Sequence, residues 1–185
     1  MSTDAAPRTG GTTPGPAPAV PAQTRAPAVD DVRWLSAEQQ ASWRSYRDGT
    51  ARLLAALAHA LEAETGLSMN EYEVLVRLSE APGRMLRMSE LAEGLAHSRS
   101  RLTHTIRRME EEGLVARSAC EVDARGVNCA MTEEGWRRLV EAAPSHVASV
   151  REHLVDVLGA EQLAALGDAM ETVREHLLRG PCHAE

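Results

Sequence analysis

The fold of this chain is decided by residues 98–118, which read SRSRLTHTIRRMEEEGLVARS. Leu102, Ile106 and Met109 fall at positions i, i+4 and i+7, so they share one face of a helix and predict that this face is buried. The remaining face is basic, because the first eleven residues of the stretch contain four arginines, one histidine and no acid. Gly113 is expected to end the helix, since glycine readily adopts the left-handed conformation that closes one.

The residues on either side place this basic helix in a larger motif. A shorter helix is predicted from about Ser89, and Gly94 to His97 would form the turn between the two helices. After the basic helix, residues 114–118 and 127–131 are short stretches separated by a polar loop, which predicts a β-hairpin. A helix pair followed by a hairpin is typical of winged helix-turn-helix proteins, whose second helix enters the major groove of DNA. We therefore expect a mainly α fold with a small β-hairpin wing.

The outward side chains of the basic helix are hydrogen-bond donors that suit duplex DNA. Arginine can bond guanine through two N–H groups, and serine or threonine can reach bases or phosphates. An arginine near the tip of the hairpin suits the narrow minor groove, and another at its base suits a phosphate. The predicted contacts in the helix are Arg99, Ser100, Arg101, Thr103, His104 and Arg107, and those in the hairpin are Arg117 and Arg125.

The upstream region predicts two further helices and a tail. Residues 1–31 hold six of the nine prolines and few large apolar side chains, so we expect a disordered tail. Ser36 and Ser68 each begin a capping box, which predicts one helix from Ser36 to about Gly66 and a second one that ends near Ala81.

The downstream region predicts two amphipathic helices. Thr132 caps the first, in which Pro144 is expected to cause a kink or a short break, and Gly159 separates it from the second. Together with the first helix of the chain they are expected to bundle, either within one chain or across a dimer. Their apolar positions are Trp136, Leu139, Ala143, Val147, Val150, Leu154 and Val157, then Leu163, Leu166, Met170, Val173 and Leu177.

The net charge has to be considered region by region. The whole chain carries a formal charge of −7, which by itself argues against a nucleic-acid partner. Residues 84–108, however, hold six arginines and two glutamates, a net charge of +4, so the rest of the chain is strongly acidic. An acidic body should disfavour non-specific wrapping of DNA and orient the basic part toward the duplex.

The stretch from Arg87 to Gly135 resembles the MarR-type transcription regulators. The resemblance rests on the order and spacing of SELA (89–92), SRS (98–100), EGLVAR (112–117), an Asp-x-Arg sequence at 123–125 and TEEG (132–135). It extends over about residues 33–179.

The resemblance implies a homodimer that binds a pseudo-palindromic operator, most often as a repressor modulated by a small ligand. It makes residues 98–112 the recognition helix, which adds Ser98 to the DNA contacts, and it makes Asp123 the partner that orients Arg125 in the wing. The implied domains are a tail (1–31), an N-terminal dimerisation helix (32–66), the winged helix-turn-helix lobe (67–132), C-terminal dimerisation helices (133–179) and a flexible end (180–185).

The resemblance also suggests where a ligand would bind. Such regulators commonly take small aromatic anions between the dimerisation helices and the DNA-binding lobe, which here implies Trp43, Tyr46, Arg47 and Tyr72. A basic residue among aromatic ones suits such a ligand. The alternative is that Trp43 and Tyr46 are ordinary core residues and that Arg47 belongs to a surface ion pair.

Two other kinds of control rest on cysteine and histidine. Cys120 and Cys129 flank the predicted wing and would face each other across the hairpin, so their oxidation could weaken DNA binding. No cysteine lies near the start of the first helix, where the family's peroxide sensors carry one. His146 and His153 are seven residues apart, a spacing that favours a structural or interfacial role over a metal site. We expect neither a metal nor a cofactor.

Other classes of protein are less consistent with the sequence. No nucleophile, base and orienting group assemble, and no phosphate-binding loop or His-Glu-x-x-His motif occurs, so an enzyme is not expected. No segment is apolar enough to span a membrane or to act as a signal peptide, which favours a cytoplasmic protein associated with the nucleoid. A winged-helix module that binds protein instead of DNA is the remaining alternative, and it would present apolar or acidic residues where this chain has arginines.

Overall fold

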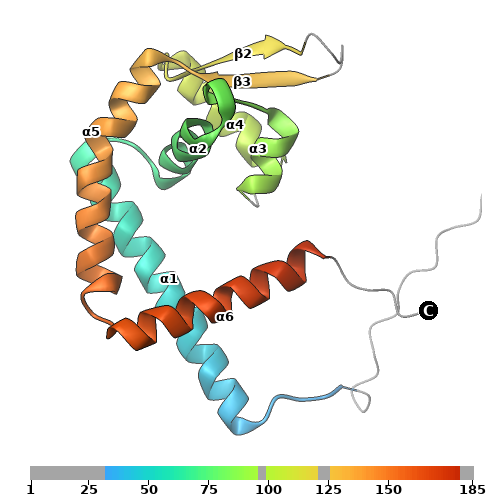
Figure 1. The fold of residues 1–185 in the computed structure, drawn as a ribbon, viewed down its shortest axis with the longest axis vertical. Coiled ribbons are helices and arrows are strands. Elements are labelled where there is room, and N and C mark those ends of the chain that lie inside the picture. Colours follow the sequence, from blue (N-terminus) through green and yellow to red (C-terminus); the bar gives the residue numbers. More distant parts are fainter. Residues whose placement is uncertain (1–31, 96–98, 121–125, 180–185) are drawn as a thin grey trace, which may run out of the picture. The chain divides into compact units, whose positions relative to one another are not determined.

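The computed structural model describes residues 32–95, 99–120 and 126–179. The described residues fall into two units, one that ends at residue 40 and one that begins at residue 41. In chain order the elements are α1 (Ala37–Thr65), α2 (Met69–Glu80), the short 3-10 turn η2 (Pro82–Arg84), β1 (Met85–Arg87), α3 (Met88–Gly94), α4 (Arg99–Glu111), β2 (Val115–Ala119), β3 (Val127–Met131), α5 (Glu133–Val150), the π-helical turn η3 (Arg151–Val155) and α6 (Ala160–Leu178), as drawn in Figure 1. The expected fold class, mainly helical with a small hairpin wing, is confirmed.

The two predicted capping boxes begin their helices as expected. The backbone N–H of Gln39 donates to the Ser36 hydroxyl at 3.1 Å, and the Gln39 side chain accepts from the N–H of Ser36 at 2.9 Å. Ser68 and Glu71 exchange the same two bonds at the start of α2, at 3.4 and 2.9 Å. Such boxes satisfy backbone donors that have no partner within the helix.

The sheet has three antiparallel strands in the order β1-β3-β2, so the wing is one strand larger than predicted. The hairpin β2–β3 has the register Val115↔Met131 and Arg117↔Cys129. The unpredicted strand β1 pairs with β3 through Leu86↔Cys129. Strand β1 has three residues, which are too few to show the alternation of apolar and polar side chains that identifies a strand in a sequence. It is a strand because it pairs with β3, a segment some forty residues later in the chain.

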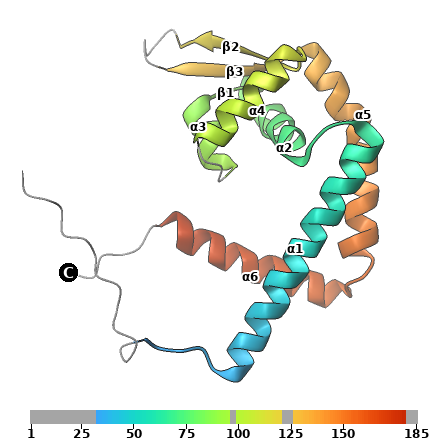
Figure 2. The ribbon, with the colours of Figure 1, turned by 180° about the vertical axis from the view of Figure 1, so that it is seen from behind.

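One core holds the winged helix-turn-helix part together. Helices α2, α3 and α4 gather beside the sheet, as Figures 1 and 2 show from opposite sides. The predicted inward residues of α4, Leu102, Ile106 and Met109, are at most 1% exposed. Each large apolar side chain removed from water in this way contributes about 1.5–3 kcal/mol. The core residues they meet include Leu75, Leu78, Leu91, Val115, Cys129, Met131 and Leu139.

Helix α5 starts in close contact with Leu114, the residue before β2, and a glycine makes that contact possible. The Thr132 hydroxyl accepts from the N–H of Gly135 at 3.0 Å, which confirms the predicted cap, and donates to the carbonyl of Gly113 at 2.7 Å. A Cβ atom on Gly135 would lie 2.1 Å from the backbone oxygen of Leu114. Any side chain at this position would therefore push α5 away from the sheet.

Of the kink or short break predicted at Pro144, the break is wrong, because α5 runs through this residue from Glu133 to Val150. Pro144 lies on the exposed side of the helix. Pro144 has no backbone N–H, so the carbonyl of Val140 lacks its usual partner within the helix. Val140 is half-exposed, and its carbonyl can bond water instead. The irregular turn comes later, where Arg151–Val155 forms the π-helical turn.

Parts of the apolar stripes of α1 and α5 and most of the stripe of α6 are exposed among the described residues. On α6 Leu163 is half-buried, but Leu166, Met170, Val173 and Leu177 are all exposed, and Leu177 is 71% exposed. On α1 and after α5, Leu54 and Val157 are 53% and 67% exposed. Among the described residues, none of the helices is long and apolar enough to cross a membrane.

Candidate nucleic-acid interface and ligand pocket

The outer face of α4 carries the side chains that the sequence assigns to DNA. Arg101, Thr103, His104 and Arg107 are exposed, and so is Ser100 at the start of the helix. Their exposure follows from the burial of Leu102, Ile106 and Met109, which fixes the rotation of the helix about its axis. Ser98 lies outside the described residues, as do Asp123 and Arg125 between β2 and β3, and of Arg99 only the backbone is described.

Arg108 on the same helix has a structural contact that the sequence analysis missed. Its guanidinium donates to the carboxylate of Glu71 at 2.7 Å and to the Ser68 hydroxyl at 3.2 Å. Arg108 is itself half-exposed, while the side chain of Glu71 is 2% exposed. The contact joins α4 to the start of α2, so this arginine of the basic stretch holds α4 in position.

The Glu71 carboxylate is held in its charged form at this place. Burial alone would raise its pKa, but the hydrogen bonds from the side chain and backbone of Ser68 and the adjacent Arg108 guanidinium outweigh burial, and the pKa is lowered. A buried carboxylate is tolerated when its oxygens are paired in this way. The signal available in the sequence was the capping box, which places Glu71 but does not reveal its second partner.

Arg117 connects the wing to α4. Its guanidinium donates to the Glu110 carboxylate from Nε at 3.0 Å and from Nη2 at 2.6 Å, and its backbone N–H donates to the same carboxylate at 3.2 Å. About a third of each side chain is exposed. Arg117, which the sequence predicts to contact a phosphate, therefore holds β2 against the end of α4.

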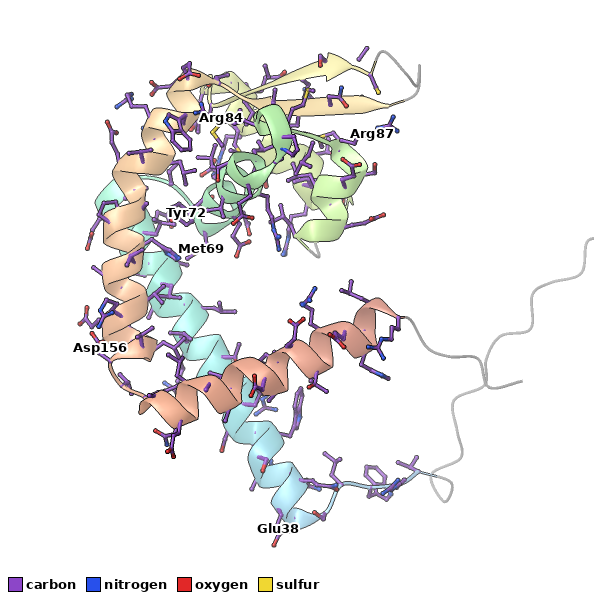
Figure 3. All side chains as sticks on the ribbon, in the orientation of Figure 1. Glu38, Met69, Tyr72, Arg84, Arg87 and Asp156 are labelled. Carbon is purple, nitrogen blue, oxygen red and sulfur yellow. The ribbon has the colours of Figure 1, made fainter. Side chains whose placement is uncertain are left out.

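A second arginine connects the sheet to α5. Arg84, labelled in Figure 3, precedes β1 in a left-handed conformation with φ 54°. Its guanidinium lies 4.1 Å from the centre of the Trp136 ring and 3.2 Å from the carboxylate of Glu133. The cation–π contact with Trp136 and the ion pair with Glu133 both stabilise the Arg84 side chain in this position. They offset the strain of the left-handed backbone at Arg84.

The two wing cysteines do not face each other, which corrects the alternative in which they were placed opposite each other across the hairpin. Cys129 pairs with Arg117 across the hairpin, whereas the backbone N–H of Cys120 bonds the carbonyl of Gly126. The cysteines are therefore offset by three positions, about 10 Å along the strand, beyond the reach of a disulfide. Burial raises the pKa of Cys129 to about 11, and the Cys120 sulfur accepts a hydrogen bond from Arg87 at 3.4 Å.

A pocket of about 610 Å³ lies between α1, α2, α5 and the end of α3. Of the four residues predicted to bind a ligand only Tyr72 lines it, and Figure 3 labels Tyr72 and Met69 on α2. The pocket is lined by Leu54, Leu57, Met69, Tyr72, Glu73, Val76, Arg77, Glu80, Gly94, Leu95 and His146.

The other three predicted ligand residues lie on α1 outside the pocket. Trp43 and Tyr46 are 52% and 41% exposed and contact each other, with ring centres 5.9 Å apart. They are therefore not core residues of the single chain either. Arg47 forms a surface ion pair with Asp48 at 2.8 Å, as the alternative interpretation expected. Helical spacing placed these residues together but could not show which of them faces the lobe.

His146 belongs to the pocket and not to a metal site. Its ring lies 4.6 Å from the ring of Tyr72, centre to centre. Burial lowers its pKa, although the nearby Glu73 carboxylate acts in the opposite direction. Within the described ranges, no three histidine, cysteine or acidic side chains are grouped as a metal site requires.

These features define a winged helix-turn-helix protein of the kind that regulates transcription. The profile of the MarR family matches residues 67–127. AbsC, a MarR family transcriptional regulator from Streptomyces coelicolor, is 44% identical over 79% of this chain and 98% of AbsC, with a TM-score of 0.74. The chain belongs to the MarR family of transcription regulators, as the sequence motifs predicted.

Two further relatives are informative. Sco3205, a MarR family regulator from Streptomyces coelicolor whose crystal structure is a complex with DNA, is 40% identical over 83% of this chain and 97% of its own, with a TM-score of 0.77. The transcriptional repressor YetL of Bacillus subtilis is 28% identical over 119 residues, which are 61% of this chain and 71% of YetL.

Proposed function

We propose that this protein is a sequence-specific DNA-binding regulator that acts at the nucleoid as a homodimer. The observation that carries the proposal is the division of α4 into a buried apolar face and an exposed face with Arg101, His104 and Arg107. An exposed face of this kind can enter the major groove and donate hydrogen bonds to base edges. The DNA complex of the 40% identical Sco3205 supports this use of the lobe.

The wing supplies the second part of the proposed interface. Arg117 at the base of β2 is held by Glu110, so its proposed phosphate contact would be made by a guanidinium that is already oriented. Arg125, between β2 and β3 in the sequence, is proposed to enter the minor groove with Asp123 as its partner. Ser98 and Arg99 are proposed to contact DNA from the start of α4.

The homodimer is proposed because large apolar side chains of the terminal helices are left exposed by the part of the chain that the structure describes. Val157, Val173 and Leu177 are between 48% and 71% exposed. Burying such stripes against a second copy would remove them from water, at about 25 cal/mol for each Å² of apolar surface. A twofold axis would then set the separation of the two recognition helices near one turn of the duplex, which requires a pseudo-palindromic operator.

The proposed mode of control is repression relieved by a small ligand. YetL, at 28% identity, is named a repressor, and the pocket between α2 and the helices α1 and α5 is a place where a ligand could change the separation of the lobes. A ligand shifts such an equilibrium only as far as it binds one arrangement better than the other.

Selection of bound sequences from a random pool of duplex DNA tests this function. We expect a recovered palindromic consensus, whose half-sites lie one helical turn apart, because dimer symmetry is copied into the operator. The matched control is the Arg101→Ala/Arg107→Ala double variant, which should recover no consensus while remaining folded. Recovery of unrelated sequences by the wild-type protein would refute sequence-specific binding.

Sedimentation equilibrium tests the dimer independently of DNA. The chain has a mass of 20.0 kDa, and we expect twice this mass at micromolar concentration. Leu177→Asp and Val173→Asp should shift the equilibrium toward the monomer, because a charge cannot be buried there without a partner. A wild-type monomer would refute the dimer.

A further inference from the structure

The pocket between α2 and α5 has a charge pattern that differs from the one expected for an anionic ligand. Two of its lining residues, Glu73 and Glu80, are carboxylates, and Arg77 is the one arginine among the lining residues that the structure describes. One N–H of Arg77 already donates to the carbonyl of Gly94 at 3.0 Å, so the guanidinium is tied to the end of α3.

The histidine of the pocket does not add a positive charge. His146 lies against Tyr72, with ring centres 4.6 Å apart, and its Nδ1 atom is buried with no hydrogen-bond partner among the described residues. Burial lowers the pKa of His146, so the imidazole is neutral at pH 7. Among the described lining residues, a bound anion would meet two carboxylates and one cation.

The rest of the pocket is apolar and wide enough for a ring system. Leu54 and Leu57 of α1 and Val76 of α2 contribute aliphatic surface, and Tyr72 and His146 contribute ring surface. A pocket of about 610 Å³ is within the range of sites that hold molecules of drug size. Its acidic residues lie on one face of α2, because positions seven apart are two helical turns apart.

We infer that this pocket binds an organic cation with an aromatic or aliphatic ring body, whose positive group pairs with Glu73 or with Glu80 and whose rings pack against Tyr72 and Leu57. This ligand class replaces the aromatic anion expected from the sequence, because the arginine behind that expectation, Arg47, is outside the pocket and bonded to Asp48. The role of such a cation as an effector rests on the proposed function, but the charge preference of the pocket does not.

Three probes with one ring system measure this preference: naphthylmethylammonium, naphthylmethanol and naphthoate, titrated into the full-length protein by calorimetry at pH 7 and constant ionic strength. We expect the cation to bind about fivefold to tenfold more tightly than the anion, since each partly exposed ion pair contributes up to about 1 kcal/mol. Glu73→Gln and Glu80→Gln should each weaken binding of the cation and strengthen that of naphthoate. Glu152→Gln, which removes the same charge from an exposed residue outside the pocket, should change neither.

The possible results separate this inference from the proposed function. Any of three results would overturn the inference. These are binding of naphthoate that is as tight as that of the cation or tighter, no binding of any of the three probes, and an unchanged preference for the cation over the anion in the Glu73→Gln/Glu80→Gln double variant. Binding to selected DNA is measured on the same preparation. Loss of the charge preference with intact DNA binding contradicts only this inference, whereas an intact preference without DNA binding contradicts only the proposed function.

Discussion

The guanidinium of Arg108 on α4 lies 2.6 Å from the carboxylate of Glu71 on α2, and this carboxylate is almost completely buried. The pair connects the helix that is proposed to read DNA with the first turn of the helix that lines the ligand pocket. Arg107, the preceding residue, forms an exposed ion pair with Glu111, at 3.3 Å. Two adjacent arginines thus have different tasks, one in positioning α4 and the other on its outer surface.

Arg108→Ala should therefore lower the free energy of unfolding by about 2–3 kcal/mol, because it leaves a buried carboxylate without its charged partner. Arg107→Ala is the matched control and should change it by less than about 0.5 kcal/mol, since an exposed pair on one helix contributes little. Urea unfolding followed by circular dichroism measures both. Equal stability of the two variants would contradict the positioning role of Arg108.

Glu71 and His146 should each make the free energy of unfolding depend on pH, in two different pH ranges. The pKa of Glu71 is lowered in the folded protein, so its contribution is complete above the unfolded value of about 4.3 and is lost as the pH falls through the lower folded value. Burial lowers the pKa of His146 below its unfolded value of about 6.5, so the unfolded chain gains a proton first as the pH falls below that value. Stability should thus decline in two steps on acidification.

Single variants assign each step. The free energy of unfolding is measured between pH 3 and pH 8 for each variant. In His146→Gln it should no longer decline as the pH falls below about 6.5, and in Glu71→Gln it should no longer decline below about pH 4.3. A His146→Gln protein with the same slope as the wild type between pH 5 and pH 6.5 would show that His146 is not protected from protonation in the folded state.

The features that the sequence predicted correctly are local ones. The capping boxes at Ser36 and Ser68, the cap at Thr132 and the inward face of α4 all depend on residues within a few positions of each other. Each of these signals has a direct physical cause in hydrogen bonding or helical periodicity. The identification of the family rests on the same local motifs.

The features that the sequence analysis missed depend on contacts between distant segments. Strand β1 is defined by pairing with β3, and Arg108 meets Glu71 across thirty-seven positions of the chain. The offset of Cys120 from Cys129 follows from the hairpin register, which periodicity alone does not set. The ligand residues were misplaced for the same reason, since only the packing of α1 shows that Leu57 faces the pocket and Trp43 does not.

Gly135 offers a test of the contact between α5 and the sheet. Gly135→Ala should lower the free energy of unfolding by about 2–3 kcal/mol, because the added Cβ would meet the backbone oxygen of Leu114. Gly49→Ala is the matched substitution in α1, where nothing lies within 4 Å of the added atom, and it should stabilise the protein by about 0.5–1 kcal/mol. Thermal unfolding compares them, and a Gly135→Ala variant as stable as Gly49→Ala would show that α5 can shift freely.

The wing cysteines should not form a disulfide with each other. Cys129 is fully buried with a pKa raised to about 11, so it is protonated at neutral pH and reacts slowly. Treatment of the native protein with diamide, followed by peptide mapping, should recover no bond between Cys120 and Cys129. Cys129→Ala should leave the effect of peroxide on DNA binding unchanged, and a peroxide response that disappears in this variant would restore the redox interpretation.

Removing a contact with a base and removing a contact with a phosphate should have different effects on the affinity for DNA and on the dependence of that affinity on salt. Arg125→Ala and Arg101→Ala should each weaken operator binding by about 1–3 kcal/mol where the arginine reads a base, and should lessen the slope of affinity against salt where it neutralises a phosphate. Arg174 is a suitable control, because it is an exposed arginine of α6 that is paired with Glu171 and should have no contact with DNA. Fluorescence anisotropy titrations at several salt concentrations separate the two effects. Arg125→Ala binding as tightly as Arg174→Ala would remove the wing from the interface, and the same result for Arg101→Ala would mean that the exposed face of α4 is not the surface that meets DNA.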